Sequence, residues 1–257
     1  MKRESIFQDQ IPSVLKKINE NGKDTKLSVV IPALNEEAGI GAVINQIPVE
    51  KLNKIGYQVE IIVVDNNSTD RTGEIAREHG ARVIFQPVRG YGHAYKSGFD
   101  DATGDIIATG DADMTYPFDA LPEMLATLHE NRIDFITTDR LSGLNPKAMT
   151  ISHVLGNKLL SRFARFLFRI PFRDSQSGMW IFRRSIWPHL EVHSGGMPFS
   201  QELKIEAFVK GFKCLEVHIE YRPRVGEVKL NTLKDGIRNT THLFKKSFTI
   251  RKNKKKP

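Results

Sequence analysis

The sequence predicts an α/β fold in which a mainly parallel sheet is flanked by helices. Short apolar runs typical of buried strands alternate with amphipathic segments typical of helices, a pattern that indicates a mainly parallel sheet with helices on both faces. The second predicted strand ends in an acid, Asp65, that is followed by a polar turn. The chain has 257 residues, 40% of them hydrophobic and 26% charged, which is ordinary for a globular domain of this class.

The first half of the chain carries the alternation most clearly. We expect strands at 27–32, 59–65, 81–85, 106–108 and 133–137. Between them, hydrophobic periodicity predicts helices at 35–46, from about 70 to 79, at 93–101 and at 117–130. Asn35 is a natural N-cap for the first helix, Thr69 or Asp70 can cap the second, and Pro117 suits the first turn of the last.

The second half departs from this pattern. Residues 149–169 mix apolar and basic side chains at helical spacing, which predicts an amphipathic helix. A loop enters a strand within 172–182, followed by a helix at 199–210, a strand at 212–221 and a last amphipathic helix at 230–248. We therefore expect a peripheral N-terminal segment (1–26) with a short helix, a main domain (27–230), and a C-terminal amphipathic helix with a basic tail (231–257).

Charge and cysteine usage restrict the location and the partners. The net charge is +8, and basic residues are concentrated at 245–246 and 251–256. Such a tail can bind nucleic acid, attach to anionic lipid, or remain solvated. The single cysteine, Cys214, excludes an intramolecular disulfide and fits a reducing compartment. Because we find no secretory signal and no apolar run near the ~20 residues that span a bilayer, we expect a cytoplasmic protein without a transmembrane segment.

Two acids stand one residue apart after the fourth predicted strand. Asp111 and Asp113 follow the apolar run 106–108. In an extended strand both side chains point the same way, and two carboxylates repel each other unless a cation lies between them. Mg²⁺ or Mn²⁺ would fit, because such cations prefer oxygen ligands and bridge carboxylates to phosphates. The alternative is an ordinary turn, where Asp and Gly are common.

Three further segments are candidates for binding. Asp65 ends a predicted parallel strand, at the edge where α/β sheets place ligand-binding groups. Glycines mixed with Arg89 and Lys96 before a helix suit an anion such as phosphate; the alternative is a flexible loop with incidental cations. The helix at 149–169 suits either an anionic membrane surface or the protein core, with its basic face in solvent.

Taken together, these segments resemble family 2 glycosyltransferases with the GT-A fold, and above all the branch of dolichol-phosphate (polyprenyl-phosphate) mannosyl- and glucosyltransferases. The resemblance covers about residues 27–235 and rests on short motifs in a fixed order. They are VVIPALNE (29–36), VVDNNSTD (63–70), RGYG (89–92), DAD (111–113), DSQSG (174–178) and RVGEVK (224–229).

This resemblance implies a Rossmann-like, mainly parallel mixed sheet. It also implies a metal-dependent, inverting transfer of a hexose from a GDP- or UDP-linked nucleotide-sugar. Pro32, Asn35 and Glu36 would hold the base and ribose, and Asp65 would hydrogen-bond one of them. Two basic side chains, Arg89 and, with a weaker match, Lys96, would lie near the nucleotide or its diphosphate.

The same resemblance implies the metal and phosphate ligands. Asp111 would lie by the ribose and the metal, and Asp113 would bind Mg²⁺ or Mn²⁺ directly. The mannosyl branch has a glutamine metal ligand two residues after the second Asp; here Thr115, a weaker neutral ligand, takes that position and leaves the mannose donor open. Arg224 and Lys229 match the family's late basic motif and suit the donor or acceptor phosphates.

The implied acceptor is a polyprenyl (dolichyl) phosphate. Its phosphate is already ionised near neutral pH, so the transfer needs no general base, unlike transfer to a sugar hydroxyl. Glu202 stands roughly where hydroxyl-using relatives place an acid pair, but Leu203 replaces the second acid, so Glu202 is expected to orient the sugar or a basic residue. A lipid acceptor implies a peripheral protein on the cytosolic membrane face, held by 154–169 and 243–256.

Three other functions fit the sequence less well. A nucleotidyltransferase would need a glycine-rich basic loop after the first strand, where residues 32–36 are acidic and lack glycine. A nucleic-acid-binding protein would explain the +8 charge, but the basic residues lie outside any recognition motif. A glycosyltransferase with a soluble glycan or protein acceptor would require a clearer catalytic base. The sequence predicts no oligomeric state.

Overall fold

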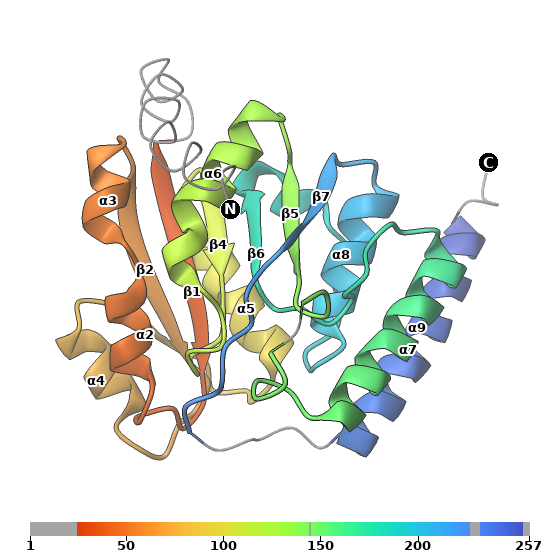
Figure 1. Ribbon diagram of the computed structural model, residues 1–257, viewed down its shortest axis with the longest axis horizontal. Helices are drawn as coiled ribbons and strands as arrows, with labels where there is room; N and C mark the ends of the chain where they lie inside the picture. Colours follow the sequence, from red (N-terminus) through yellow and green to blue (C-terminus); the bar gives the residue numbers. More distant parts are fainter. Residues whose placement is uncertain (1–24, 144, 227–231, 254–257) are drawn as a thin grey trace.

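The computed structural model describes residues 25–143, 145–226 and 232–253, which form an α/β domain around a seven-stranded sheet (Figure 1). The strand order is β3–β2–β1–β4–β6–β5–β7. Strand β6 runs antiparallel to its neighbours β4 and β5, and the other paired strands are parallel. The predicted mainly parallel, mixed sheet is confirmed. The strands are β1 (Lys26–Ala33), β2 (Gln58–Asp65), β3 (Arg82–Phe85), β4 (Ile106–Thr109), β5 (Phe135–Asp139), β6 (Trp180–Arg183) and β7 (Cys214–His218).

Helices cover both faces of the sheet. One apolar cluster packs α2, α3 and α6 against one face, and a second packs α5 and α8 against the other. A third cluster joins α7, α8 and α9 at the side of the domain. The helices are α2 (Ile40–Gln46), α3 (Val49–Lys54), α4 (Thr72–Glu78), α5 (Tyr91–Asp101), α6 (Leu121–Glu130), α7 (Ile151–Phe168), α8 (Phe199–Val209) and α9 (Thr232–Asn253), with short 3₁₀ helices at Phe118–Ala120 and Arg184–His189.

Burial on both faces explains why the central strands contain runs of consecutive apolar residues, as at 29–31 and 61–64. In β1, Val29 and Ile31 contribute to the cluster under α2, whereas Val30 contributes to the cluster under α5. A strand of this kind has no solvent-facing side, so an alternating apolar–polar pattern is not expected. This is why β1 and β2 could be predicted from sequence to within a residue or two.

Two predicted helix starts are wrong. The first helix begins at Ile40, with Gly39 rather than Asn35 at its N-cap position. Asn35 has a left-handed φ of 53°, and its side-chain oxygen accepts a hydrogen bond from the Thr69 amide at 2.8 Å. The helix expected at 117–130 begins at Leu121, because Pro117 precedes a 3₁₀ turn instead of the first helical turn.

Helix α4 starts close to its predicted position. Arg71 takes the N-cap position, and the Asp70 carboxylate, one residue earlier, accepts the Thr72 amide at 3.0 Å. Among the residues that the structure describes, no helix combines the length and the apolar character that crossing a membrane requires. The short helix expected in the N-terminal segment lies outside the described residues, and the division of the chain at 26 and 230 stays a prediction.

Candidate active site

Two polar loops meet at the carboxyl edge of β1 and β2. The last residues of these strands, Ala33 and Asp65, are paired in the parallel register, which brings the following loops together. The Asn35 amide donates to the Ser68 hydroxyl at 3.0 Å, and the Asn35 side-chain oxygen accepts the Thr69 amide. Asp65 in turn accepts the Ser68 amide at 2.9 Å. The predicted nucleotide-binding residues Asn35 and Asp65 therefore belong to one connected rim.

The Asp111–Asp113 pair lies beyond the end of the neighbouring strand β4. Because β4 ends at Thr109 and the chain turns at 112–114, with a left-handed φ of 66° at Met114, the extended-strand geometry predicted for the two acids is wrong. Asp113 is only 3% exposed. One of its oxygens accepts both the amide (3.1 Å) and the hydroxyl (2.6 Å) of Thr115. Thr115 thus orients Asp113.

Arg224 joins two of the predicted acidic residues. Its guanidinium donates to Asp113 and to Glu36, at 2.6 Å in each case. The Val225 amide donates to the Asp113 carbonyl at 2.9 Å and so fixes this late segment of the chain on the loop after β4. The guanidinium Nε is buried without a hydrogen-bond partner among the described residues. One cation therefore offsets the charge of two nearly buried carboxylates.

Asp111 has a different environment. The Tyr91 hydroxyl, at the start of α5, donates to Asp111 at 3.2 Å. Withdrawal from bulk water, and secondly the negative charge of Asp113, raise the pKa of Asp111 to about 7. The two acids are thus close enough to affect each other despite the turn between them. Tyr91 lies in the RGYG motif, but sequence reasoning assigned it no role.

Gly178 lies close to Tyr91 and Asp111 because it has no side chain. A Cβ on Gly178 would lie 2.2 Å from the Tyr91 hydroxyl oxygen and 3.4 Å from Asp111 Oδ1. The Gly178 amide donates to the Tyr116 hydroxyl at 2.6 Å, so this backbone segment is fixed against the acid. Any larger residue at position 178 would displace Tyr91, which explains the glycine of the DSQSG motif.

The remaining predicted binding residues are held by backbone carbonyls or by the sheet. Pro32 stands opposite Val64 in the β1–β2 ladder, next to the rim. Arg89 donates to the Asn67 carbonyl at 2.8 Å and remains exposed. Lys96 lies farther along α5, and its ammonium donates to the His193 carbonyl at 3.1 Å rather than to Asp111 or Asp113. Lys229 lies outside the described residues.

Glu202 on α8 is almost fully buried and has fixed partners. It accepts the Ser194 amide at 2.8 Å and the His193 amide at 3.2 Å, and it pairs with Lys246 of α9 at 3.1 Å. Burial alone would raise the pKa of Glu202, but hydrogen bonds from His242 and Ser194 and the charge of Lys246 together lower it. A carboxylate held in this way is a poor proton acceptor and a good anchor for the loop before α8.

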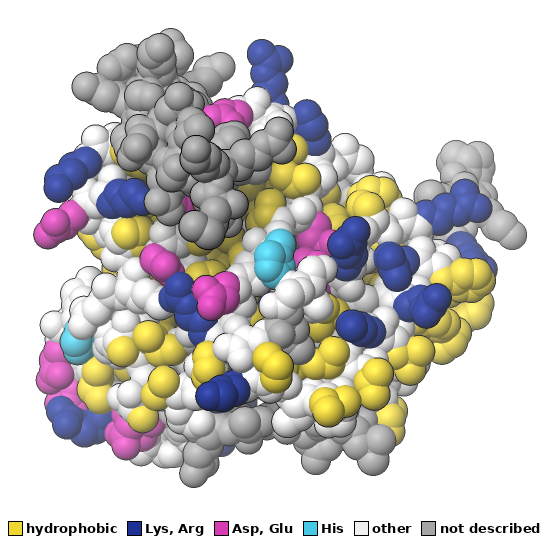
Figure 2. Space-filling model, in the orientation of Figure 1, with side chains coloured by type: hydrophobic (Ala, Val, Ile, Leu, Met, Phe, Trp, Pro, Cys, Tyr) yellow, Lys and Arg dark blue, Asp and Glu magenta, His cyan; other side chains and the backbone are white. Residues whose placement is uncertain are grey.

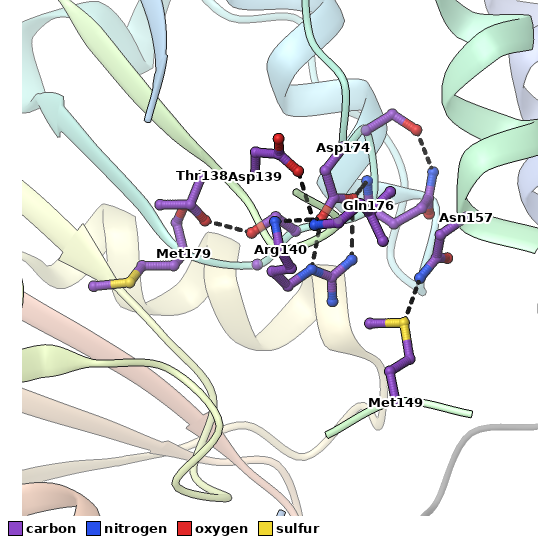
Figure 3. Close-up of polar contacts among 12 residues, drawn as sticks. Thr138, Asp139, Arg140, Met149, Asn157, Asp174, Gln176 and Met179 are labelled. Carbon is purple, nitrogen blue, oxygen red and sulfur yellow. Dashed lines mark hydrogen bonds and ion pairs between the residues drawn. The ribbon is translucent and has the colours of Figure 1, made fainter. Parts of the chain in front are cut away.

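A buried ion pair joins the DSQSG loop to the end of β5 (Figure 3). Arg140, just after β5, donates to both carboxylate oxygens of Asp174, at 2.7 and 3.0 Å. Lys204 of α8 donates to the Asp174 carbonyl at 2.7 Å, and burial lowers the pKa of its ammonium to about 7. Sequence reasoning gave Arg140 and Lys204 no role, because nothing in their local sequence indicates a partner so far along the chain.

Breaking this pair should destabilise the protein strongly. Asp174→Ala leaves the buried Arg140 guanidinium without its carboxylate, which costs about 3–5 kcal/mol in comparable pairs. We expect a melting temperature roughly 10 °C lower, measured by calorimetry. The double variant Arg140→Met, Asp174→Leu removes both charges and should recover most of that loss. A melting temperature for Asp174→Ala within about 2 °C of the parent would contradict the assigned role.

Amide side chains connect the same loop to α9. Gln176 donates to Gln201 of α8 at 3.0 Å and accepts from the Asn239 side chain at 3.0 Å. Gln201 also donates to the Asn239 carbonyl at 2.8 Å. Since Gln176 is two residues before Gly178, this network links α9 to the backbone beside Asp111.

The arrangement suits an anionic ligand bound together with a cation. The paired carboxylates at the rim are hard oxygen donors, which Mg²⁺ and Mn²⁺ prefer. In the described part of the chain, no group of three His, Cys, Asp or Glu side chains could hold a metal ion. A cation at Asp111 and Asp113 would therefore complete its coordination with water or with the oxygens of a bound molecule such as a diphosphate.

Known proteins share sequence similarity with most of this chain. The family model for glycosyl transferase family 2 matches residues 28–190. A low-salt glycan biosynthesis hexosyltransferase, Agl6, of Haloferax volcanii is 40% identical over 85% of this chain and 53% of its own length. The chain thus spans about half the length of that relative. A dolichyl-phosphate hexose transferase of the same organism is 35% identical over 82% of this chain and 89% of its own length.

Solved structures support the fold. The crystal structure of glucosyl-3-phosphoglycerate synthase from Mycobacterium tuberculosis, in complex with Mn²⁺, uridine diphosphate and phosphoglyceric acid, superposes with a TM-score of 0.73. It is 24% identical and covers 92% of this chain and 82% of its own. At this identity the likeness establishes the architecture alone, and the predicted GT-A fold is confirmed.

Proposed function

The chain belongs to glycosyltransferase family 2, and on that premise we propose that it transfers a hexose from a GDP- or UDP-linked sugar to a polyprenyl phosphate. The observation that carries the proposal is the set of Asp111, Asp113, Glu36 and Arg224 at the carboxyl edge of the sheet. The carboxylates can act as ligands of a divalent metal ion, and the Arg224 guanidinium can pair with a phosphate. A leaving diphosphate requires both, because its negative charge grows as the bond to the sugar breaks.

The donor would lie along the rim formed by the loops after β1 and β2. Pro32, Asn35 and Glu36 would hold its base and ribose, and Asp65 would accept a hydrogen bond from one of them. Arg89 is exposed next to this rim and would reach the nucleotide or its diphosphate. Lys96 would have to leave the His193 carbonyl to do the same, so we rank it behind Arg89.

Mg²⁺ or Mn²⁺ would be held by Asp113 and Asp111, with the donor diphosphate completing its ligands. When bound, the cation would supply charge compensation for the leaving group. The donor set fits, because a cation would stabilise the ionised form of Asp111, which burial and, secondly, the charge of Asp113 disfavour. The hydroxyl of Thr115 would reach the cation directly or through water, while its present hydrogen bond orients Asp113. Arg224, and Lys229 by its place in the motif, would contact donor or acceptor phosphates.

The acceptor assignment is supported by the state of Glu202. Its carboxylate is committed to Lys246 and to two backbone amides, and its pKa is lowered, so it is unsuited to take a proton from a sugar hydroxyl. A phosphate acceptor is already ionised and needs no such base. Glu202 would act instead by fixing the loop at 193–194. A relative named dolichyl-phosphate hexose transferase supports the same acceptor class.

A polyprenyl phosphate lies in a membrane, so the protein would act as a peripheral enzyme on the cytosolic face.

To test the reaction, the purified chain is incubated with Mn²⁺ or Mg²⁺, a panel of radiolabelled UDP- and GDP-hexoses and a polyprenyl phosphate. We expect label to enter the organic phase only when lipid, donor and divalent cation are all present. Transfer of label to water-soluble glycan or protein, with none to lipid, would replace the lipid acceptor by a soluble one.

Metal binding should depend on pH through Asp111. With its pKa near 7, Asp111 is protonated below that pH, and a cation must displace the proton. We expect the affinity for Mn²⁺ to fall by about tenfold for each pH unit below 7 and to level off above it. Electron paramagnetic resonance titrations between pH 5.5 and 8 measure this. Asp111→Asn should bind Mn²⁺ more weakly and with little pH dependence; an unchanged slope in that variant would assign the proton to another group.

A further inference from the structure

Helices α7 and α9 lie side by side and expose an apolar surface, which we call the α7–α9 face (Figures 1 and 2). On α7, Leu159 is 71% and Phe166 is 80% exposed; on α9, Phe248 is 72% exposed. The spacing of these apolar residues follows the helix period, so they form stripes rather than isolated positions. The whole apolar set is Ile151, Leu155, Leu159, Phe166, Ile237, Phe244 and Phe248.

The charge of the α7–α9 face has a single sign. Neither α7 nor the part of α9 after Asp235 contains an Asp or Glu. Exposed basic side chains instead flank the apolar stripes on both helices. They are Lys158, Arg162, Arg165 and Arg169 at α7 and Arg238, Lys245, Arg251 and Lys252 on α9.

Basic side chains beside exposed apolar stripes distinguish between possible partners. A second copy of the chain, placed face to face, would bring arginines and lysines against each other, which is unfavourable. A nucleic acid would match the charge but leave the apolar stripes in water. A bilayer that contains anionic lipids accepts the apolar side chains below its headgroups and pairs the basic ones with phosphates.

The inner side of α9 is fixed to the domain. Lys246 is buried and pairs with Glu202 and with Glu206, at 3.1 and 2.6 Å. Phe163 of α7 and Phe244 of α9 contact each other edge to face, with ring centroids 4.9 Å apart. The two helices therefore present one firm surface, and its charge and apolar content come from residues that the structure describes.

This surface is connected to the candidate active site. Asn239 of α9 bonds to Gln176, which is two residues from Gly178, the residue that packs against Tyr91 and Asp111. Glu202, bonded to Lys246, holds the amides of the loop at 193–194. A bilayer docked on α7 and α9 would thus lie beside the elements that frame the site.

We propose that the α7–α9 face docks on an anionic lipid bilayer. The inference deepens the proposed function, because it names the surface through which the enzyme would reach a lipid-borne acceptor. Its test is independent of catalysis: flotation of the full chain with vesicles of phosphatidylcholine alone, or with about 30% phosphatidylglycerol, without donor or polyprenyl phosphate. We expect flotation with the anionic vesicles only, and weaker flotation in 0.5 M salt.

Two variants separate the contributions of charge and apolar contact. The triple variant Lys158→Gln, Arg162→Gln, Arg165→Gln keeps helix-forming residues and should bind anionic vesicles roughly a hundredfold more weakly. Leu159→Gln with Phe166→Gln keeps every charge and should lose at least about tenfold. The matched control replaces three exposed basic residues elsewhere, Lys51, Lys54 and Arg132, with Gln and should bind like the parent. Truncation of α9 is a poor substitute, because it removes Lys246 from Glu202.

The remaining outcomes are decisive. Equal binding by the charge variant and its control would overturn the proposal. A different result would also overturn it: the parent does not bind vesicles but forms dimers in light scattering as its concentration rises, and Leu159→Gln with Phe166→Gln abolishes the dimers. A second copy of the chain would then cover the α7–α9 face. If vesicle binding behaves as expected but no donor transfers its sugar to lipid, the docking surface stands and the proposed reaction fails.

Discussion

Replacing Asp113 with Ala should reduce glycolipid synthesis by about a thousandfold or more, because the cation that offsets the leaving diphosphate would lose its principal ligand. The fold should survive. Arg224 keeps its 2.6 Å bond to Glu36, and the lost hydrogen bonds from Thr115 cost about 1–3 kcal/mol. The measurement pairs initial rates of label transfer with a melting curve and a Mn²⁺ titration of the same preparation.

Two companion variants make this result interpretable. Asp113→Asn preserves an oxygen for Thr115 but removes the charge, and it should lose nearly as much activity as Asp113→Ala. Asp119→Asn removes another acid, which is exposed and pairs with the half-buried Arg222 at 2.9 Å, and should leave the rate within about twofold. Near-full turnover by Asp113→Ala would show that the metal, if one is required, lies elsewhere.

Arg224→Gln should have two effects of opposite sign. Turnover should fall by about a hundredfold or more, because a cation aimed at the diphosphate is lost. Mn²⁺ should bind the nucleotide-free protein roughly tenfold more tightly, because Arg224 now offsets the charges of Asp113 and Glu36 and competes with a metal for them. A purely structural role for Arg224 would weaken both properties together.

The control for this variant is its neighbour in the same segment. Arg222 pairs with the exposed Asp119, and Arg222→Gln keeps the 3.0 Å bond from its backbone amide to the Thr115 carbonyl. It should leave both turnover and Mn²⁺ affinity almost unchanged. Weaker Mn²⁺ binding in Arg224→Gln would contradict the idea that the guanidinium competes with the metal ion for Asp113 and Glu36.

The sheet was largely predictable from the sequence, because its strands obey a local rule. A stretch of strand buried on both faces is mostly apolar, so β1, β2 and β4 stand out by their short apolar runs. Strand β6 could be predicted as a strand, but its antiparallel direction could not. That direction depends on the long excursion through α7, which returns the chain between β4 and β5.

The candidate site was predictable as a set of residues but not as a set of contacts. Asp111 and Asp113 were recognisable by their position after a strand, yet their geometry depends on a turn at Met114. The partner of Asp113 is Arg224, which is 111 positions away in the sequence. No periodicity or local motif encodes such a pair, and the same is true of Arg140 with Asp174.

The left-handed conformation of Asn35 illustrates the same limit. Asparagine before a helix usually caps it, and local reasoning predicted that here. The Asn35 side chain instead accepts a hydrogen bond from the loop after β2, because β1 and β2 are adjacent and the loops that follow them lie side by side. Long-range strand pairing thus overrode a sound local preference.

The most direct test of the account is a crystal structure of the protein with Mn²⁺ and a nucleoside diphosphate, with the metal located by its anomalous scattering. We expect one Mn²⁺ about 2.1 Å from an Asp113 oxygen and bonded to the diphosphate, with Arg224 turned toward a phosphate. Metal and nucleotide bound elsewhere, with Arg224 still bridging Asp113 and Glu36, would contradict it.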